Sequence, residues 1–139
     1  MLFRSPNEDT SFIAIATFQG CMYALGGKNS QGNRSNIAQR YNPEANQWQG
    51  VASLSSPRSS VCAVASVDHL YAIGGMADGL RISEIAEKFD VETNKWSRIA
   101  SPPEPRLDAD GVSYRQKLFL FGGKRSTRGC DMYDIRAKQ

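Results

Sequence analysis

A pair of adjacent glycines occurs three times in this chain at one fixed spacing. The pairs are Gly26-Gly27, Gly74-Gly75 and Gly122-Gly123, and each lies 48 residues from the next. Two tryptophans and two Pro-Arg pairs keep the same spacing, at Trp48 and Trp96 and at Arg58 and Arg106. Self-similarity at a period of roughly 45–50 residues is typical of a solenoid, a propeller or another repeat array.

The order of residues within each repeat is also constant. An apolar run ends in the glycine pair, an aromatic residue follows (Tyr41 or Phe89), and a tryptophan comes seven residues after it. The third repeat reaches its aromatic residue, Tyr133, four residues early, so its tryptophan position falls at 140. The chain therefore holds two full repeats and an incomplete third.

Each repeat reads as four short strands, the pattern of one propeller blade. In the second repeat we place strands at about 60–67, 70–75, 84–90 and 95–100, with errors of about 2–4 residues at each boundary. Asp68-His69 is expected to form a tight hairpin turn, and residues 76–83 a longer loop. The first two strands are apolar on both faces, which predicts a sheet covered on both sides.

The pattern resembles the kelch repeat, most closely that of the proteins that combine BTB, BACK and kelch domains. The matching segments are Leu70–Gly75, Phe89–Trp96 and Tyr41–Trp48. The resemblance implies an all-β fold, a fragment of a kelch β-propeller with about three four-stranded antiparallel blades. The chain departs from the pattern at Thr10, which stands in the arginine position, in lacking a third tryptophan, and in having no BTB or BACK sequence.

The repeat boundaries follow from this register. Residues 1–11 are read as the remnant of a preceding outer strand and a linker, 12–59 and 60–107 as kelch repeats, and 108–139 as an incomplete repeat. A closed propeller needs typically 4–8 blades, so the three repeats of this sequence cannot close a ring by themselves. The favoured explanation is a longer parent chain, and the alternative is a second copy that completes a six-bladed ring.

The recurrent glycines and arginines are expected to be structural. The glycine pairs suit close backbone approach or positive φ, whereas a phosphate-binding loop needs a GxGxxG sequence before a helix. Arg58 and Arg106 hold the same place in two repeats, and a buried acid such as Glu87 is the expected partner.

Composition excludes several functional classes. The net charge is +3 without a run of basic residues, which does not indicate nucleic acid. No segment has the ~18–20 consecutive apolar residues of a membrane span, and no signal peptide is recognisable. Three cysteines without a CxxC spacing encode neither a disulfide framework nor a zinc site, so we expect buried reduced thiols in a protein of the cytoplasm or nucleus.

The residues of a catalytic or metal site are missing from the sequence. His69 is the only histidine, and the carboxylates follow no repeat position. Without a second histidine or an activated cysteine, neither a triad nor a metal site has its usual parts. We therefore expect no enzyme, no cofactor and no metal, although some kelch propellers are copper oxidases and an oxidase remains an alternative.

The resemblance implies peptide recognition at one face of the propeller. The loops concerned are residues 28–35, 76–83 and 124–129 within the repeats, and 54–60 and 101–108 between them. The candidate contact residues on these loops are Lys28, Asn29, Arg34, Ser60, Met76, Asp78, Arg81, Asp108, Lys124 and Arg125. Several cations on one rim favour an acidic or phosphorylated peptide; the alternative is that they are ordinary solvated charges.

The predicted function is non-catalytic protein recognition. The chain resembles the substrate-binding segment of a cullin-RING ubiquitin ligase adaptor, whose ligase would be reached only through domains not present in this sequence. A second hypothesis is an actin-binding or other cytoskeletal scaffold, since some kelch proteins bind actin.

Overall fold

The chain folds into three antiparallel sheets that follow one another along the sequence. The structure, a computed structural model, describes residues 10–124, 126–127 and 129–139, so most of the predicted N-terminal remnant lies outside the described residues. Blade 1 contains β1 (Ala14–Phe18), β2 (Cys21–Leu25), β3 (Ala38–Asn42) and β4 (Gln47–Val51). Blade 2 contains β5 (Cys62–Ala65), β6 (Leu70–Ile73), β7 (Ala86–Asp90) and β8 (Lys95–Arg98). Blade 3 contains β9 (Asp110–Tyr114), β10 (Lys117–Phe121) and β11 (Cys130–Asp134).

The all-β prediction is confirmed. Strands pair in sequence order within each sheet, and among the described residues blade 3 has three strands where blades 1 and 2 have four. The one helical element of the described chain is a short 3₁₀ segment, Asp78–Leu80, within the predicted 76–83 loop. The predicted hairpin at Asp68-His69 is also present, closed by a hydrogen bond from Ser66 N–H to the His69 carbonyl at 2.8 Å.

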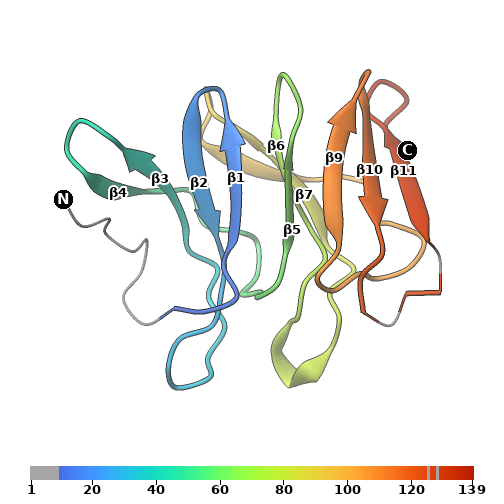
Figure 1. The fold of residues 1–139 in the computed structure, drawn as a ribbon, viewed down its shortest axis with the longest axis horizontal. Helices are drawn as coiled ribbons and strands as arrows, with labels where there is room; N and C mark the ends of the chain where they lie inside the picture. Colours follow the sequence, from blue (N-terminus) through green and yellow to red (C-terminus); the bar gives the residue numbers. More distant parts are fainter. Residues whose placement is uncertain (1–9, 125, 128) are drawn as a thin grey trace.

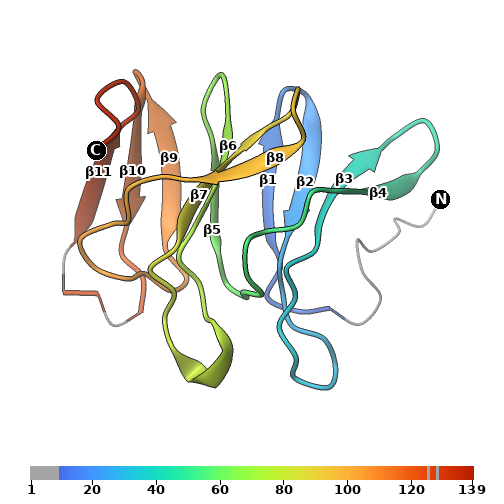
Figure 2. The ribbon, with the colours of Figure 1, turned by 180° about the vertical axis from the view of Figure 1, so that it is seen from behind.

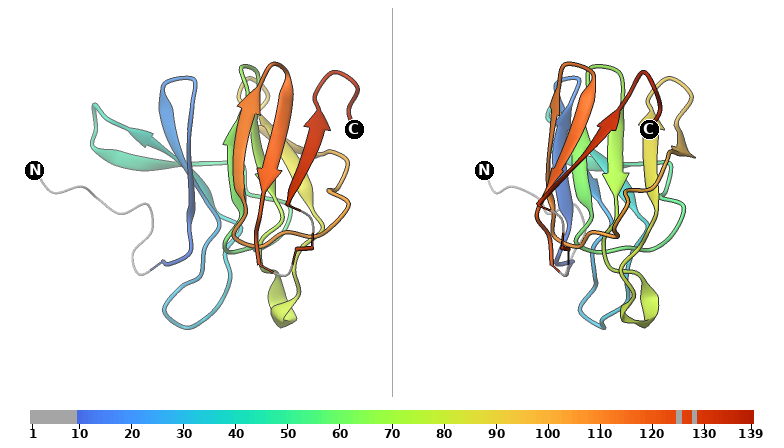
Figure 3. Two further views of the ribbon diagram at one scale, coloured as in Figure 1. Left: turned by 45° about the vertical axis from the view of Figure 1, so that its right-hand side comes forward. Right: turned by 90° about the vertical axis from the view of Figure 1, so that its right-hand side faces the viewer.

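The three sheets lie side by side, with their first strands in a row. β5 contacts β1 on one side and β9 on the other, whereas β4 and β8 lie on the opposite side of the molecule (Figures 1 and 2). The short hairpins gather at one end of the sheets and the long loops at the other (Figure 1). Figure 3 shows the sheets spreading apart from this row of first strands, as propeller blades do.

Blade 2 is buried on both faces, as its apolar strands predicted. Toward blade 1, Leu70 and Phe89 join a core with Tyr23. Toward blade 3, Tyr71 and other side chains of β5 and β6 pack against Leu118. The first strand of this blade is shorter than the predicted 60–67: β5 ends at Ala65, and Val67 lies in the turn after it, 76% exposed.

The last sheet leaves one face uncovered. Four large side chains on this face are 47–58% exposed: Val112, Tyr114, Phe121 and Met132. The same face of blade 2 carries Val64 and Ile73, which blade 3 buries. Burial in this fold therefore depends on the next blade rather than on the blade's own residues.

Arg58 joins blade 1 to blade 2 and is completely buried. Its carbonyl accepts the N–H of Gly27 at 2.9 Å, while its guanidinium donates to the carbonyl of Gly74 at 2.9 Å and to Glu87 at 2.5 Å. Burial lowers the pKa of this guanidinium below its ordinary value, and the carboxylate of Glu87 opposes that shift. The predicted pairing of Arg58 with a buried acid at Glu87 is confirmed.

Arg106 repeats the arrangement between blades 2 and 3. Its carbonyl accepts the N–H of Gly75 at 2.9 Å, and its guanidinium donates to Asp131 at 2.7 Å and to the carbonyl of Gly122. Each of these arginines thus bonds to the glycine pair of the blade before it through its backbone and to the glycine pair of the blade after it through its side chain.

The cysteines differ in burial, which corrects a prediction. Cys62 is buried between blades 2 and 3, and burial raises the pKa of its thiol to about 12. Cys21 is half-buried. Cys130 is exposed, because it lies on the uncovered face of blade 3; the expectation of a buried thiol there was wrong.

Candidate functional site: the loop end of the sheets

The site predicted from the sequence lies at the end of the sheets where the long loops gather (Figures 1 and 2). The residue that follows each glycine pair holds an equivalent place there. Isolated backbone bridges join Lys28 to Ser11, Met76 to Ser59 and Lys124 to Leu107, so each of the three is fixed beside the segment that enters its blade.

A second position recurs in all three blades with the same backbone conformation. Phe12, Ser60 and Asp108 have φ of 55°, 53° and 55°, a left-handed conformation that is uncommon outside glycine. The N–H of Ser60 donates to the carbonyl of Phe12 at 2.9 Å, and the N–H of Asp108 donates to the carbonyl of Ser60 at 3.4 Å. These residues form a continuous row from blade to blade. Phe12 was missed as a site residue, although its distance of 48 residues from Ser60 could have identified it.

Lys124 and Asp108 connect the two recurrent positions in blade 3. Their Nζ and Oδ2 atoms lie 3.0 Å apart, and the lysine side chain is 72% exposed. The hydrogen bond from Lys124 is the largest cause that lowers the pKa of Asp108 below its usual range. A smaller contribution in the same direction comes from a hydrogen bond with Ser60. Asp108 is thus ionised at neutral pH and offsets part of the charge of Lys124.

Arg34 and Asp78 connect the loops of blades 1 and 2. The guanidinium Nη1 and the carboxylate Oδ1 are 3.8 Å apart. The side chain of Arg34 is only 11% exposed, and its buried Nε takes no hydrogen-bond partner among the described residues. Arg34 is therefore seated between the loops, and Asp78, 77% exposed, is the outward member of the pair.

Asn29 and Arg81 have different surroundings. The side-chain oxygen of Asn29 accepts the N–H groups of Gln31 and Asn33 at 3.1 and 2.9 Å, so it shapes its own loop. Arg81 is exposed and lines a depression of about 390 Å³ between the 54–60 and 76–83 segments. Ser56 lines the same depression, and its buried hydroxyl has no partner among the described residues. Arg125 lies outside the described residues.

The charge of the loop end is thus less one-sided than the sequence predicted. Arg34 and Lys124 each face an aspartate. Within the described part of the chain, Lys28 and Arg81 form no ion pair. Two cations, together with the exposed ammonium of Lys124, remain available to an incoming acidic group.

Comparison with protein families identifies the repeat. The family model described as the kelch motif matches residues 10–55 and 57–103, together about two-thirds of the chain. The chain belongs to the kelch family. The first match spans β1 to β4 and the second spans β5 to β8, so each kelch motif corresponds to one complete blade. A search of curated proteins finds no matching relative.

Among residues 10–124, 126–127 and 129–139, no group of three or more histidine, cysteine or acidic side chains is placed to hold a metal ion. His69 lies in the β5–β6 hairpin, at the other end of the sheets from the loops, with its ring 6.2 Å from that of Tyr71. In the same part of the chain, no helix has the length and apolar character needed to cross a bilayer.

Proposed function

We propose that this kelch chain is a non-catalytic recognition module that binds a peptide segment of a partner protein at its loop end. The observation that carries this proposal is the recurrence of two positions on one surface. Residues 28, 76 and 124 and residues 12, 60 and 108 recur in three neighbouring blades. Their backbone is held constant while the side chains are Lys, Met and Lys at the first position and Phe, Ser and Asp at the second. A fixed backbone with differing side chains suits a surface that reads the sequence of a partner.

We infer that the partner segment is acidic or phosphorylated. Arg81 beside the depression, Lys28 and the exposed end of Lys124 supply donors for charge-assisted hydrogen bonds. Asp78 and Asp108 restrict the positions that a negative group can occupy, because like charges repel. The Nη1 atom of Arg34 becomes a further donor if the Asp78 carboxylate moves aside.

The biological setting proposed for this activity is substrate recruitment in the cytoplasm or nucleus, as in adaptors of cullin-RING ubiquitin ligases. The BTB and BACK domains that would contact the ligase are not in this sequence. The uncovered face of blade 3 is proposed to pack against the rest of a propeller or against a second copy of this chain.

The experiment begins with acidic and phosphorylated peptides selected from a display library on the 139-residue chain. The double variant Arg81→Glu/Lys124→Glu should bind the selected peptide about tenfold or more weakly, a loss of about 1.4 kcal/mol. Binding should also weaken with added salt, because salt screens exposed charges.

The matched control reverses two cations away from the loop end, Lys95→Glu and Arg115→Glu, in β8 and in the β9–β10 hairpin turn. This variant has the same net charge as the first and should bind normally. Equal affinity of the two double variants would contradict the assignment of the loop end.

A further inference from the structure

Two Asp-Gly sequences occur in the chain, Asp78-Gly79 and Asp110-Gly111. This dipeptide favours a reaction of the aspartate side chain with the main chain, because glycine carries no side chain that would shield the next amide nitrogen. The two copies have the same local chemistry. Any difference between their reactivities must therefore come from the fold around them.

The first copy lies at the tip of the loop between β6 and β7, which projects from the loop end (Figures 1 and 2). Asp78, Gly79 and Leu80 form the short 3₁₀ segment, and all three are exposed. Gly79 has φ of 71°, and a Cβ added to it would meet no atom within 4 Å. Water therefore reaches both reacting groups, the carboxyl group of Asp78 and the amide of Gly79.

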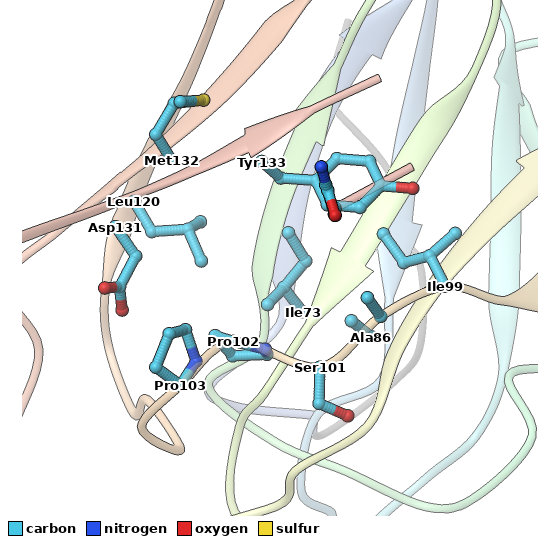
Figure 4. A pocket seen from close by; sticks show the side chains of 12 residues that line it. Ile73, Ala86, Ile99, Ser101, Pro102, Pro103, Leu120, Asp131, Met132 and Tyr133 are labelled. Atoms are coloured by element: carbon cyan, nitrogen blue, oxygen red, sulfur yellow. The ribbon is translucent and has the colours of Figure 1, made fainter. Parts of the chain in front are cut away.

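The carboxylate of Asp78 is also weakly held. Its ion-pair partner, Arg34, lies 3.8 Å away, beyond hydrogen-bond distance. Shorter hydrogen bonds hold other aspartates: Asp90 accepts a backbone N–H at 3.0 Å. Asp131, which borders a cavity of about 210 Å³ between blades 2 and 3 (Figure 4), accepts a hydrogen bond from Arg106 at 2.7 Å. Asp78 is therefore free to turn its carboxyl group toward the main chain.

The second copy, Asp110-Gly111, is held by the sheet at the start of β9. Its residues stand opposite Phe121 and Leu120 of β10. A Cβ on Gly111 would lie 2.7 Å from the Sγ atom of Cys62, so this glycine is packed against blade 2. A reaction between side chain and main chain here requires β9 to detach from its neighbours, which costs the free energy of a local opening.

The loop that carries Asp78 can change shape at its tip while its base stays closed. The N–H of Ala77 donates to the carbonyl of Arg81 at 2.8 Å, and a backbone bridge joins Met76 to Ile82. The 3₁₀ turn between these contacts is a single turn and buries none of its residues. Such a turn opens far more readily than a paired strand.

We propose that Asp78 is a site of spontaneous isomerisation to isoaspartate. The amide nitrogen of Gly79 attacks Cγ of the protonated carboxyl group and forms a C–N bond, and the carboxyl hydroxyl leaves with the amide proton as water. A second water molecule then opens the cyclic imide. Where it adds to the former backbone carbonyl, the C–N bond to that carbonyl breaks, and the main chain runs through Cβ and Cγ. The water lost at ring closure is regained at ring opening, so the atoms balance without a co-reactant.

The product changes the loop end itself. The main chain gains one methylene group between residues 78 and 79, and the free carboxylate is then attached directly to Cα. This carboxylate extends less far from the main chain, so its contact with Arg34 is lost. The reaction needs only the chain and water, so it takes place whether or not the loop end binds a peptide.

Incubation of the 139-residue chain at neutral pH in water enriched in oxygen-18 tests the proposal, because each ring opening leaves one labelled oxygen in the residue. Trypsin separates the two sites, since Asp78 falls in peptide 59–81 and Asp110 in peptide 107–115. Fragment-ion mass spectrometry locates the label and the isoaspartate within each peptide. We expect both to accumulate at least about tenfold faster at Asp78, because Asp110 reacts only from a locally opened state.

The unfolded chain and one variant provide the controls. In guanidinium chloride both Asp-Gly pairs are free of the fold, so their rates should agree within about twofold. Asp78→Glu keeps the carboxylate, but a glutamate would have to close a larger and less favourable ring. Label at position 78 should therefore fall to background in this variant.

Equal rates at the two pairs in the folded chain would overturn the proposal, as would faster reaction at Asp110. Label that persists at position 78 in Asp78→Glu would exclude the imide as its source and would overturn the proposal too. A difference that survives unfolding would show that the neighbouring sequence, and not the fold, sets the two rates, and the structural assignment would be wrong.

Discussion

At the scale of single residues, buried ion pairs fix the two arginines that join neighbouring blades. Arg58 and Glu87 in blade 2 have counterparts in Arg106 and Asp131 in blade 3. In blade 1 the arginine position is Thr10 and the acid position, opposite Ala24, is Gln39. A buried carboxylate without its cation is strongly destabilising. The two substitutions in blade 1 are therefore mutually consistent, because the acid is missing where the arginine is missing.

Removing one member of a buried pair should cost more than removing both. We predict that Arg58→Met lowers the free energy of unfolding by roughly 3–5 kcal/mol, because it leaves the Glu87 carboxylate buried and unpaired. Arg58→Met/Glu87→Gln should lose less than Arg58→Met alone. Urea denaturation of the two variants and of Glu87→Gln provides the double-mutant cycle, and additive losses would refute the coupling.

The thiols should react in order of exposure. At pH 8 a thiol reagent is expected to modify Cys130 first and Cys62 only after unfolding, because burial raises the pKa of Cys62 to about 12. The Cys62 thiol of the unfolded chain ionises above pH 9.0, whereas that of the folded chain stays neutral. The free energy of unfolding should therefore fall as the pH rises above 9.0. Mass spectrometry of the labelled peptides gives the order. Early modification of Cys62 in the folded chain would contradict it.

At the scale of elements, the glycine pair directly follows the second strand of each blade and lets the backbone turn out of the sheet there. Gly74 has φ of +66°, and a Cβ added there would collide with the carbonyl oxygen of Arg106. Gly122 has nearly the same φ, +62°, but a Cβ there meets nothing within 4 Å. The difference arises because the segment carrying Arg106 covers Gly74, whereas no described segment covers Gly122.

The two glycines form a matched pair for a mutational test. Both Gly74→Ala and Gly122→Ala incur the cost of a left-handed alanine, roughly 1–2 kcal/mol. We predict that Gly74→Ala costs clearly more, because the alanine methyl group also displaces the Arg106 backbone. Thermal or urea unfolding of the two variants measures the difference. Equal losses would show that the close approach to Arg106 is unimportant.

The strands of blade 2 were predictable from the sequence because the repeat and the apolar pattern describe the same four segments. The observed strands all fall within the predicted ranges. The pairing of Arg34 with Asp78 was not predictable, because it joins loops of different blades and depends on how the blades sit side by side. The role of Asn29 within its own loop is likewise a matter of local backbone geometry, which residue type alone does not determine.

At the scale of the whole molecule, the uncovered face of blade 3 exposes four large apolar side chains. Exposed apolar residues that form one contiguous face mark an interaction surface. On this face Val112 and Met132 both stand opposite Phe119, on either side of β10. The exposure of Cys130 shows the limit of reasoning from residue type, since its burial would depend on a neighbouring blade.

We predict that this face mediates association of the 139-residue chain. Phe121→Asp should reduce self-association measured by sedimentation equilibrium, because it places a charge in the apolar face. Val67→Asp is the matched control, since Val67 is 76% exposed in a hairpin turn away from that face. A wild-type chain that stays monomeric at all concentrations, or equal effects of the two variants, would contradict this prediction.

The central claim is that partner peptides bind at the loop end, and a nuclear magnetic resonance titration tests it most directly. An acidic peptide selected on the chain is added to isotopically labelled protein, and amide shifts are mapped onto the blades. We predict that the largest changes cluster at Lys28, Ser60, Met76, Arg81 and Lys124. Changes confined to the hairpin end, around His69 and Arg115, with none at the loop end would contradict the account.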